Sequence, residues 1–276
     1  MTPPAALTIA GSDSGGGAGM QADLKTFAAL GVHGTCAVTA VTAQNTVGVI
    51  ALHSPPASFL TAQLDAVLSD FSVQATKTGF LATTDNIAAV VAHADRLGRL
   101  VVDPVMVSSR GDRIVSQAAQ HAYVATLFPR ATVITPNARE AAMLLGRSVR
   151  TVDELQEAAS ALHNLGPTVV VVKGGGLSGK ESIDAVFDGT SSWLLRAPRV
   201  ATPNNHGTGC SFSAATVAHL ALGFSMSDAL LAAKEYVTAG LRSSAAWRLG
   251  AGHGPIDHMH RYRLQMPQSR DAQPPS

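Results

Sequence analysis

The sequence contains little cysteine and little charge. It has two cysteines in 276 residues, Cys36 and Cys210, which is too few for a disulfide framework. Neither these cysteines nor the histidines show the ligand spacing of a structural zinc site. Charged residues make up 14% of the chain and the net charge is +1, so we expect no nucleic-acid partner. The composition favours a protein that acts on a small molecule.

Long apolar runs are also missing. No stretch reaches the ~18–20 apolar residues that a helix needs to span a bilayer. The first residues, MTPPAALTIAGSD, do not combine a basic region with an apolar run, as a secretory signal does. We therefore expect a cytoplasmic protein without a membrane partner.

Apolar residues make up 46% of the chain, which is enough for a sizeable core. Short apolar runs alternate with amphipathic helical stretches, which predicts an α/β fold: a central, mostly parallel sheet with helices on both faces. The strand-forming segments are expected at 5–10, 36–42, 73–79, 100–106, 131–137 and 168–176, with an antiparallel pair over 184–198 and two final helices from 210 to 247. We expect one domain over residues 1–276, ordered from about 5 to 258, with 259–276 as a flexible tail.

A glycine-rich segment, GSDSGGGAGMQADLK (11–25), follows the first expected strand. Ligands of open parallel sheets bind beyond the carboxyl ends of the strands. Glycines let the backbone approach a ligand, and the following helix offers free N–H groups. The glycines do not fit the dinucleotide pattern G-x-G-x-x-G. A flexible connection is the alternative, but five glycines in nine residues favour ligand contact.

A second glycine-rich segment, GGGLSGKES (174–182), nearly matches the phosphate loop G-x-x-x-x-G-K-[ST]. Glu181 replaces the hydroxyl residue that should hold magnesium, and ESIDAVFDG continues as a strand rather than a helix. We therefore reject a phosphate loop here, and keep the glycines as candidate nucleotide contacts.

The segment NARE places Asn137 and Glu140 at the head of an expected helix. The two residues are three apart and therefore lie on one helical face, where they could hold a hydrated magnesium ion. An ordinary capping box is the alternative, and it is the better interpretation of this segment taken alone.

The segment HGTGC places Cys210 where a glycine turn becomes a helix. Backbone N–H groups of Gly207, Thr208 and Gly209 would suit the charge on a transferring phosphoryl group. A helix start lowers a thiol pKa, so Cys210 could act as a general base. A small buried hydrophobe is one alternative. A Cys–His nucleophile with His206 is another, although we expect His206 to be a spectator.

Together these motifs resemble the hydroxymethylpyrimidine/phosphomethylpyrimidine kinases of thiamine biosynthesis, which have the ribokinase-like fold. The resemblance covers about residues 5–258 and rests on six segments in the same order and spacing: ALTIAGSDSGGGAGMQADLKTFAALG, AVTAVTAQNTVGV, VVDPVM, TPNAREAAMLLG, VVVKGGG and HGTGCSFSAA. It implies an enzyme that uses ATP and Mg²⁺ to phosphorylate a hydroxymethylpyrimidine and then its monophosphate. By analogy with the fold it also implies a homodimer.

The resemblance also implies roles for individual residues. Cys210 would be the catalytic thiol, with Gly207–Gly209 as its anion hole. The substrate pocket would comprise Ala18, Gly19, Asp23, Gln44, Phe80 and Val107, of which Asp23 and Gln44 would hydrogen-bond the aminopyrimidine. Magnesium would be held by Asp103 and Glu140. Nucleotide and phosphate contacts would come from Asp103, Asn137, Lys173, Gly174, Gly175, Lys234 and Arg110.

Two positions depart from the family pattern. Phe80 stands where the family often has methionine, which would reshape the pyrimidine pocket. The family's flap lysine is replaced by Ser109, with Arg110 beside it, and this affects the second phosphorylation most. The alternatives are a vitamin B6 kinase, which the absence of a cysteine in the flap (106–114) disfavours, a non-catalytic pyrimidine-binding relative, and a cysteine hydrolase.

Overall fold

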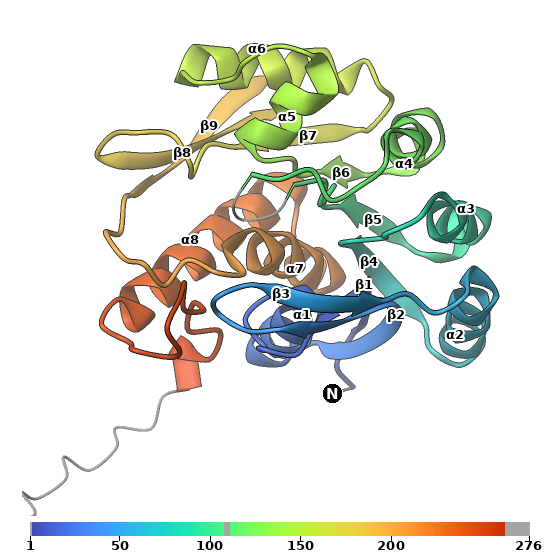
Figure 1. The fold of residues 1–276 in the computed structure, drawn as a ribbon. Coiled ribbons are helices and arrows are strands. Elements are labelled where there is room, and N and C mark those ends of the chain that lie inside the picture. Colours follow the sequence, from blue (N-terminus) through green and yellow to red (C-terminus); the bar gives the residue numbers. More distant parts are fainter. Residues whose placement is uncertain (1, 108–110, 263–276) are drawn as a thin grey trace, which may run out of the picture.

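The computed structural model describes residues 2–107 and 111–262, and these residues form a nine-stranded sheet with helices on both faces (Figure 1). The strand order is β3-β2-β1-β4-β5-β6-β7-β8-β9. The strands β2, β1, β4, β5, β6 and β7 run parallel, whereas β3, β8 and β9 each pair antiparallel with a neighbour. Their bounds are β1 Ala5–Asp13, β2 His33–Gln44, β3 Val49–His53, β4 Val73–Thr78, β5 Arg99–Val102, β6 Val133–Ile134, β7 Val169–Lys173, β8 Glu181–Phe187 and β9 Ser192–Pro198.

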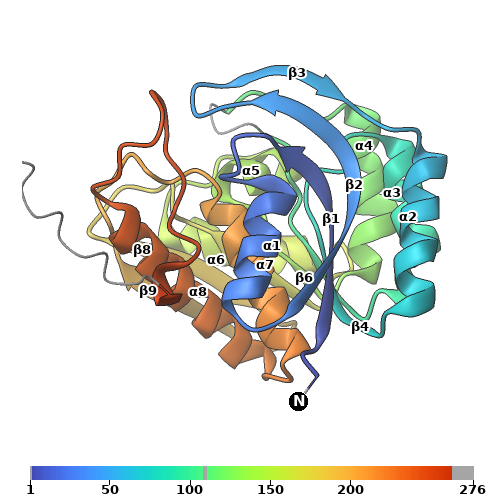
Figure 2. The same ribbon diagram turned by 90° about the horizontal axis from the view of Figure 1, so that it is seen from below.

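The helices cover the two faces of the sheet, and each face has its own apolar core (Figure 2). One face is covered by α1 (Gly19–Ala29), α7 (Thr208–Ala221) and α8 (Met226–Ser244). The other is covered by α2 (Ala57–Asp70), α3 (Thr84–Ala92), α4 (Gln117–Ala122), α5 (Ala138–Leu145) and α6 (Val152–His163). The first four residues of β7 are all valine because both faces of that strand are buried.

The structure confirms the predicted α/β architecture, including the antiparallel pair that β8 and β9 form. It also confirms that GGGLSGKES leads into a strand. The sequence did not predict β3, which makes a hairpin with β2 and exposes all five of its residues. A period-two burial pattern could not identify a strand that has no buried face.

The helix at HGTGC begins earlier than predicted, at Thr208 rather than at Cys210. Gly207 caps this helix with a left-handed backbone (φ +80°), which ends the preceding turn one residue before the helix. Cys210 therefore lies within the first turn of α7, not at its boundary.

The chain after α8 folds back against that helix. Residues 259–262, which we assigned to the tail, include a short 3₁₀ turn (His260–Tyr262), and Arg261 lies over the ring of Tyr236. The remainder of the predicted tail, 263–276, lies outside the described residues. Among the described helices, none is long and apolar enough to cross a membrane.

Candidate active site

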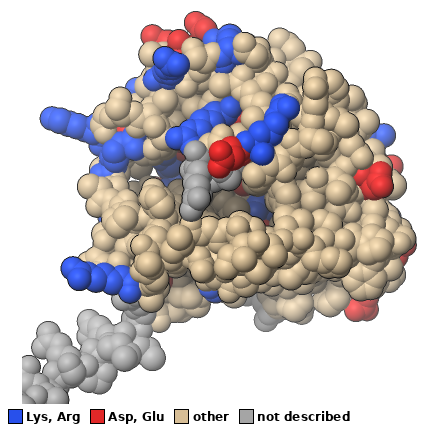
Figure 3. All heavy atoms as spheres, in the orientation of Figure 1, with Lys and Arg blue, Asp and Glu red and all other residues tan. Residues whose placement is uncertain are grey.

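The polar residues singled out in the sequence gather where the parallel strands end. β1 leads into the glycine-rich loop, β2 ends at Gln44, and Asp103 directly follows β5. Lys173 ends β7, and the first turn of α7 faces it. This face of the molecule is hollowed, with basic side chains along one side of the hollow (Figure 3). The arrangement is the one expected of a ligand site in a parallel sheet.

The glycine-rich loop is held by Asp13, a residue that the sequence analysis did not single out. Its carboxylate accepts hydrogen bonds from the backbone N–H groups of Gly15 (2.8 Å), Gly17 (3.0 Å) and Ala18 (2.8 Å). Burial opposes ionisation, but the hydrogen bonds from His206 and from these amides prevail and lower the pKa of Asp13. An ionised Asp13 therefore fixes the shape of the loop.

The same loop packs against the turn before α7. A Cβ on Gly207 would overlap the carbonyl oxygen of Gly17, and one on Gly19 would overlap that of Gly11. The side chain of Phe80 lies beside Gly11, 3.4 Å from where a Cβ would stand. Gly207 and Gly19 must therefore be glycine, and their close contacts bring the predicted anion hole and the predicted pyrimidine pocket together.

The first turn of α7 differs in one respect from the predicted anion hole. Both the backbone N–H (3.3 Å) and the hydroxyl (2.6 Å) of Thr208 donate to the carbonyl of Asn205. Thr208 therefore points back into the turn. First-turn amides have no acceptor within their helix, so of the predicted donors those of Gly207 and Gly209 remain for an anion, and Cys210 offers another. A Cβ on Gly209 would lie 3.1 Å from Nζ of Lys173, so this lysine adjoins the same turn.

The predicted lowering of the Cys210 pKa is wrong. Burial raises the pKa of the thiol, with smaller contributions in the same direction from the carboxylates of Asp23 and Asp103. The ammonium of Lys77 and the N–H of Gly19 favour the thiolate but do not outweigh burial. Cys210 is consequently a protonated thiol in the resting site.

Asp23 also differs from expectation. Its side chain is fully buried, and its oxygens contact Nζ of Lys77 (2.6 Å) and the hydroxyl of Thr8 (2.6 Å). Although burial opposes it, the Asp23 carboxylate raises the pKa of Lys77, which is also fully buried. The Asp23 side chain thus forms an internal ion pair and has no exposed surface.

The histidine before the glycine turn does not pair with the thiol. Nε2 of His206 lies 3.0 Å from Oδ2 of Asp13 and 3.3 Å from Nε2 of Gln44. The ring therefore faces the glycine-rich loop and the end of β2, which disfavours the Cys–His nucleophile.

Asp103 is the centre of a buried polar cluster. Its carboxylate contacts Nζ of Lys173 (2.9 Å) and the hydroxyls of Ser213 (3.1 Å) and Thr135 (3.3 Å). Burial opposes ionisation, but Lys173 and Lys77 prevail and lower the pKa of Asp103. This cluster joins the ends of β5 and β7 to α7.

Glu140 forms the second carboxylate of this region. Burial raises its pKa to about 7, the charge of Asp103 adds to this, and Lys173 opposes it. Asn137 and Glu140 also form the capping box of α5: Asn137 Oδ1 accepts from the N–H of Glu140 (3.0 Å), and Glu140 Oε2 accepts from that of Asn137 (2.9 Å). The capping interpretation is therefore confirmed, and the cap holds Glu140 in the site.

These carboxylates are compatible with a divalent cation. Burial leaves Glu140 half-protonated near neutral pH beside an ionised Asp103, so a cation would relieve their repulsion. Carboxylate oxygens are the ligands that Mg²⁺ prefers, usually with several waters retained. In the described ranges there is no group of three or more His, Cys, Asp or Glu residues that could hold a metal ion. Two carboxylates and a water shell are the arrangement that fits.

Lys234, a predicted phosphate contact, forms a buried ion pair with β8. Its Nζ donates to Asp184 (2.7 Å) and Ser182 (3.1 Å), and the other oxygen of Asp184 accepts from the N–H of Gly174 (2.9 Å). The ion pair is buried. Lys234 thus stabilises β8 and, through Asp184, the backbone of Gly174.

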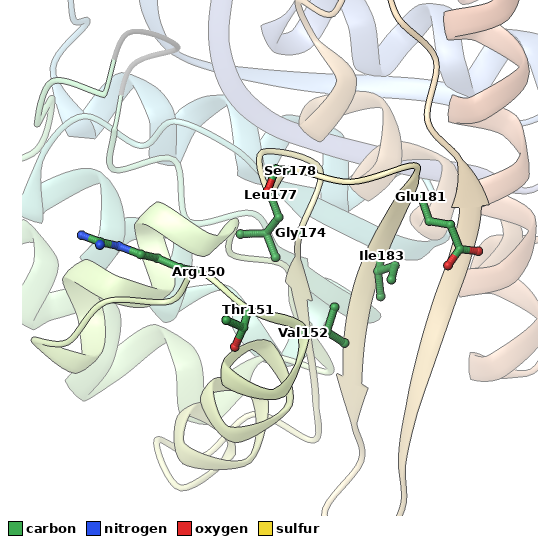
Figure 4. Close-up of a pocket in the computed structure, with 8 residues that line it drawn as sticks. All are labelled: Arg150, Thr151, Val152, Gly174, Leu177, Ser178, Glu181 and Ile183. Atoms are coloured by element: carbon green, nitrogen blue, oxygen red, sulfur yellow. The ribbon is translucent and has the colours of Figure 1, made fainter.

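The loop after β7 is held by an arginine that the sequence analysis missed. The guanidinium of Arg199 donates to the carbonyls of Gly175 (2.7 Å), Gly179 (2.7 Å) and Glu181 (2.9 Å). A pocket of about 200 Å³ adjoins this loop (Figure 4). It is lined by Arg150, Thr151, Val152, Gly174, Leu177, Ser178, Glu181 and Ile183, and it lies at the start of α6.

The predicted flap begins as a narrow hairpin. Val107 is buried and bridges Arg113, and the N–H of Ile114 donates to the carbonyl of Met106 (3.0 Å). Arg110, the predicted replacement for the family lysine, lies outside the described residues, as does Ser109. A Cβ on Gly111 would contact the guanidinium of Arg139, which places this end of the flap over α5.

Sequence reasoning missed four residues of the site: Asp13, Lys77, Ser213 and Arg199. Lys77 carried a signal, because a charged residue within the buried strand VQATKT needs a partner. Asp13 carried a weaker signal, as the one carboxylate among the five glycines. Ser213 and Arg199 had no distinguishing pattern.

Comparison with known proteins places the chain among kinases of one family. A model of the phosphomethylpyrimidine kinase family matches residues 13–257. The hydroxymethylpyrimidine/phosphomethylpyrimidine kinase of Rhizobium meliloti (strain 1021) is 47% identical over 259 residues, which are 93% of this chain and 97% of that protein.

Solved structures share the ribokinase-like fold. The chain is similar to Bacillus subtilis pyridoxal kinase in its ADP complex, with a TM-score of 0.88 and 38% identity, covering 95% of this chain and 100% of that one. It is also similar to phosphomethylpyrimidine kinase from Clostridium difficile 630, with a TM-score of 0.76 and 36% identity, covering 85% and 98%.

Proposed function

Since the chain belongs to the phosphomethylpyrimidine kinase family, we propose that the site around Cys210 carries out that family's chemistry. The protein is a kinase of thiamine biosynthesis that uses ATP. It phosphorylates 4-amino-5-hydroxymethyl-2-methylpyrimidine to the monophosphate and then to the pyrophosphate. The observation that carries the residue assignment is the convergence of Cys210, the N-terminus of α7 and the Asp103–Lys173 pair at one edge of the sheet.

Cys210 is the general base for the first phosphorylation. Its raised pKa means that little thiolate is present at neutral pH, but the thiolate that forms is a strong base. Gly19 N–H and Lys77 stabilise that thiolate. It accepts the proton of the pyrimidine hydroxymethyl group as the oxygen bonds to the γ-phosphorus of ATP and the bond from that phosphorus to ADP breaks. The acceptor of the second step is already an anionic phosphate, so it needs this base less.

The transferring phosphoryl group is stabilised by backbone and lysine donors. The N–H groups of Gly209 and Cys210 and the ammonium of Lys173 meet at the start of α7, where anion charge is favoured. Asp103 and Glu140 would hold Mg²⁺, which neutralises phosphate charge when bound. Ser213 and Thr135 orient Asp103.

The pyrimidine ring is held beside the glycine-rich loop. The amide of Gln44 and the backbone of Ala18–Gly19 supply polar contacts, while Phe80 and Val107 supply apolar walls. Asp23 contributes indirectly by holding Lys77, because its two oxygens already accept hydrogen bonds from Lys77 and Thr8. Gly174 and Gly175 remain the candidate nucleotide contacts.

Turnover tests this assignment. The wild-type protein and Cys210→Ala would be given Mg-ATP with the hydroxymethylpyrimidine or its monophosphate, and the products identified by mass spectrometry. Cys36→Ala is the matched control, because Cys36 lies in β2 away from α7. We expect Cys210→Ala to slow the first step more than the second. Equal losses in both steps would contradict the base assignment, and no turnover by the wild type would contradict the proposed function.

Vitamin B6 phosphorylation is the second candidate activity. The observation that favours it is the match of this chain to pyridoxal kinase over nearly its full length. Pyridoxal also carries a hydroxymethyl group on a heteroaromatic ring, and Phe80 changes the wall that such a ring would meet. Parallel turnover with pyridoxal decides this: a higher kcat/KM for pyridoxal than for the pyrimidine would make it the main activity.

The protein also acts, in our proposal, as a cytoplasmic homodimer. The edge strand β3 supports an association between two copies, because Val49, Ile50 and Leu52 expose half or more of their surface. Light scattering after size-exclusion chromatography tests this: a monomer at micromolar concentration would contradict it.

A further inference from the structure

Three segments that are distant in sequence meet at the ring of His206. Its Nε2 lies 3.0 Å from Oδ2 of Asp13 in the glycine-rich loop and 3.3 Å from the side-chain amide of Gln44 at the end of β2. A Cβ on Gly17 would lie 2.6 Å from the ring, so the ring packs directly on the loop. The backbone N–H of His206 donates to the carbonyl of Gly254 (3.0 Å), which holds the backbone of His206 in place.

The protonation of this nitrogen follows from its partners. Asp13 is ionised, since its pKa is lowered, and a carboxylate can only accept hydrogen bonds. An unprotonated Nε2 would place a lone pair against that charge at 3.0 Å. Nε2 of His206 therefore carries a proton and donates it toward Asp13.

The orientation of the Gln44 amide follows in turn. A protonated Nε2 can only donate, so the amide atom facing it must be the oxygen, and the amide is rotated by 180° to present Oε1 there. Its NH₂ then faces the hydroxyl oxygen of Thr42, 3.3 Å away. That hydroxyl has one proton, which it donates to the carbonyl of Ser12 (2.8 Å), so it is free to accept from the amide. No two donors of the network then face each other, and one N–H of the Gln44 amide remains for a ligand.

We propose that His206 is a positioning residue that fixes which way the Gln44 amide faces the substrate, and thereby selects an aminopyrimidine over its oxo analogue. This rests on the proposed function, in which Gln44 contacts the ring. The remaining amide N–H and the second lone pair of Oε1 offer one donor and one acceptor side by side. A 4-aminopyrimidine presents the complementary pair, an amino donor beside a ring-nitrogen acceptor, as adenine does toward an amide. The 4-oxo analogue presents the reverse pair.

The test is the ratio of kcat/KM for the 4-amino substrate to that for its 4-oxo analogue. In His206→Leu the amide can rotate, so we expect this ratio to fall by about tenfold or more. In His206→Gln one amide N–H can donate to Asp13 and the other to Gln44, so the ratio should stay near the wild-type value.

His121→Leu makes the same change at an exposed position on α4 and is the matched control. Thr42→Val removes the other anchor without removing a hydrogen-bond partner of the Asp13 carboxylate, and should lower the ratio even if His206→Leu does not fold.

The outcomes separate the two hypotheses. An unchanged ratio in both His206→Leu and Thr42→Val would overturn the role of His206 while leaving the kinase activity intact. Equal losses in His206→Leu and His206→Gln for both substrates, with an unchanged ratio, would reduce His206 to a structural residue. A wild-type protein that phosphorylates neither pyrimidine would refute the proposed function, and this inference with it.

Discussion

The turn at Gly207 lies directly against the carbonyl oxygen of Gly17, so closely that a side chain on Gly207 would overlap it. This contact joins the loop after β1 to the start of α7. Gly207 also has a left-handed backbone (φ +80°), which a residue with a side chain adopts only at a cost of ~1–3 kcal/mol.

We therefore expect Gly207→Ala to destabilise the protein by more than that strain alone and to reduce turnover by about tenfold or more. Gly223→Ala is the matched control, because Gly223 has a similar φ of +89° but open space around it. Urea unfolding and turnover of the two variants check this. Equal destabilisation with full activity in both would show that the contact with Gly17 has no role.

The buried ion pair between Lys77 and Asp23 gives a second prediction. Lys77→Met leaves the Asp23 carboxylate buried without its counter-charge, which should lower the free energy of unfolding by ~3–5 kcal/mol. Adding Asp23→Asn should restore part of this loss. Arg96→Met breaks an exposed pair with Asp65 and should change stability by less than ~1 kcal/mol. Similar effects of Lys77→Met and Arg96→Met would contradict the prediction.

The pKa of Glu140 predicts a pH dependence of stability. Its folded-state pKa is about 7 and its ordinary value 4.5, so between these values the folded protein holds a proton that the unfolded chain releases. The contribution of Glu140 to the free energy of unfolding should therefore fall as pH rises from about 4.5 to about 7, in opposition to His258, whose pKa burial lowers to about 4. The pKa of Asp103 is lowered from its ordinary value of 3.8, so this residue changes the stability only below about pH 3.8 and does not affect this interval.

Glu140→Gln removes this titration, so its stability relative to the wild type should rise across the same interval. Urea unfolding in metal-free buffer at several pH values measures the difference. Parallel stability curves for the two proteins would show that Glu140 titrates normally.

The thiol of Cys210 should react slowly at neutral pH. Its pKa is raised above 9.0, so the thiolate fraction, and with it the alkylation rate, should still be increasing as pH passes 9.0. The measurement is the rate of iodoacetamide modification in a Cys36→Ser background, followed by mass spectrometry. A rate that reaches its plateau below pH 9.0 would mean that α7 and Lys77 outweigh burial.

Much of the fold was predictable because its signals are local. Apolar runs such as VVVV in β7 identify buried parallel strands, and Asn137 with Glu140 identifies a capping box from four residues. The glycine turn at HGTGC was also visible. The strand β3 was not predictable, because its exposed residues have no alternating pattern.

The side chains of the site were less predictable, because their partners are distant in sequence. Lys234, a candidate phosphate contact, pairs with Asp184, and Asp23, a candidate substrate contact, pairs with Lys77. Nothing near either residue in the sequence indicates these partners.

The sequence by itself determined the alternation of strands and helices, the edge at which a ligand binds, and the residue types that meet there. Short-range backbone preferences and burial periodicity are sufficient for that. Only the tertiary structure decided the direction of the Cys210 pKa and the partner of His206, which is Asp13, far away in the sequence. A pKa is the sum of burial and of every nearby charge, and a hydrogen bond needs two atoms within about 3 Å. Both depend on which segments the fold brings together.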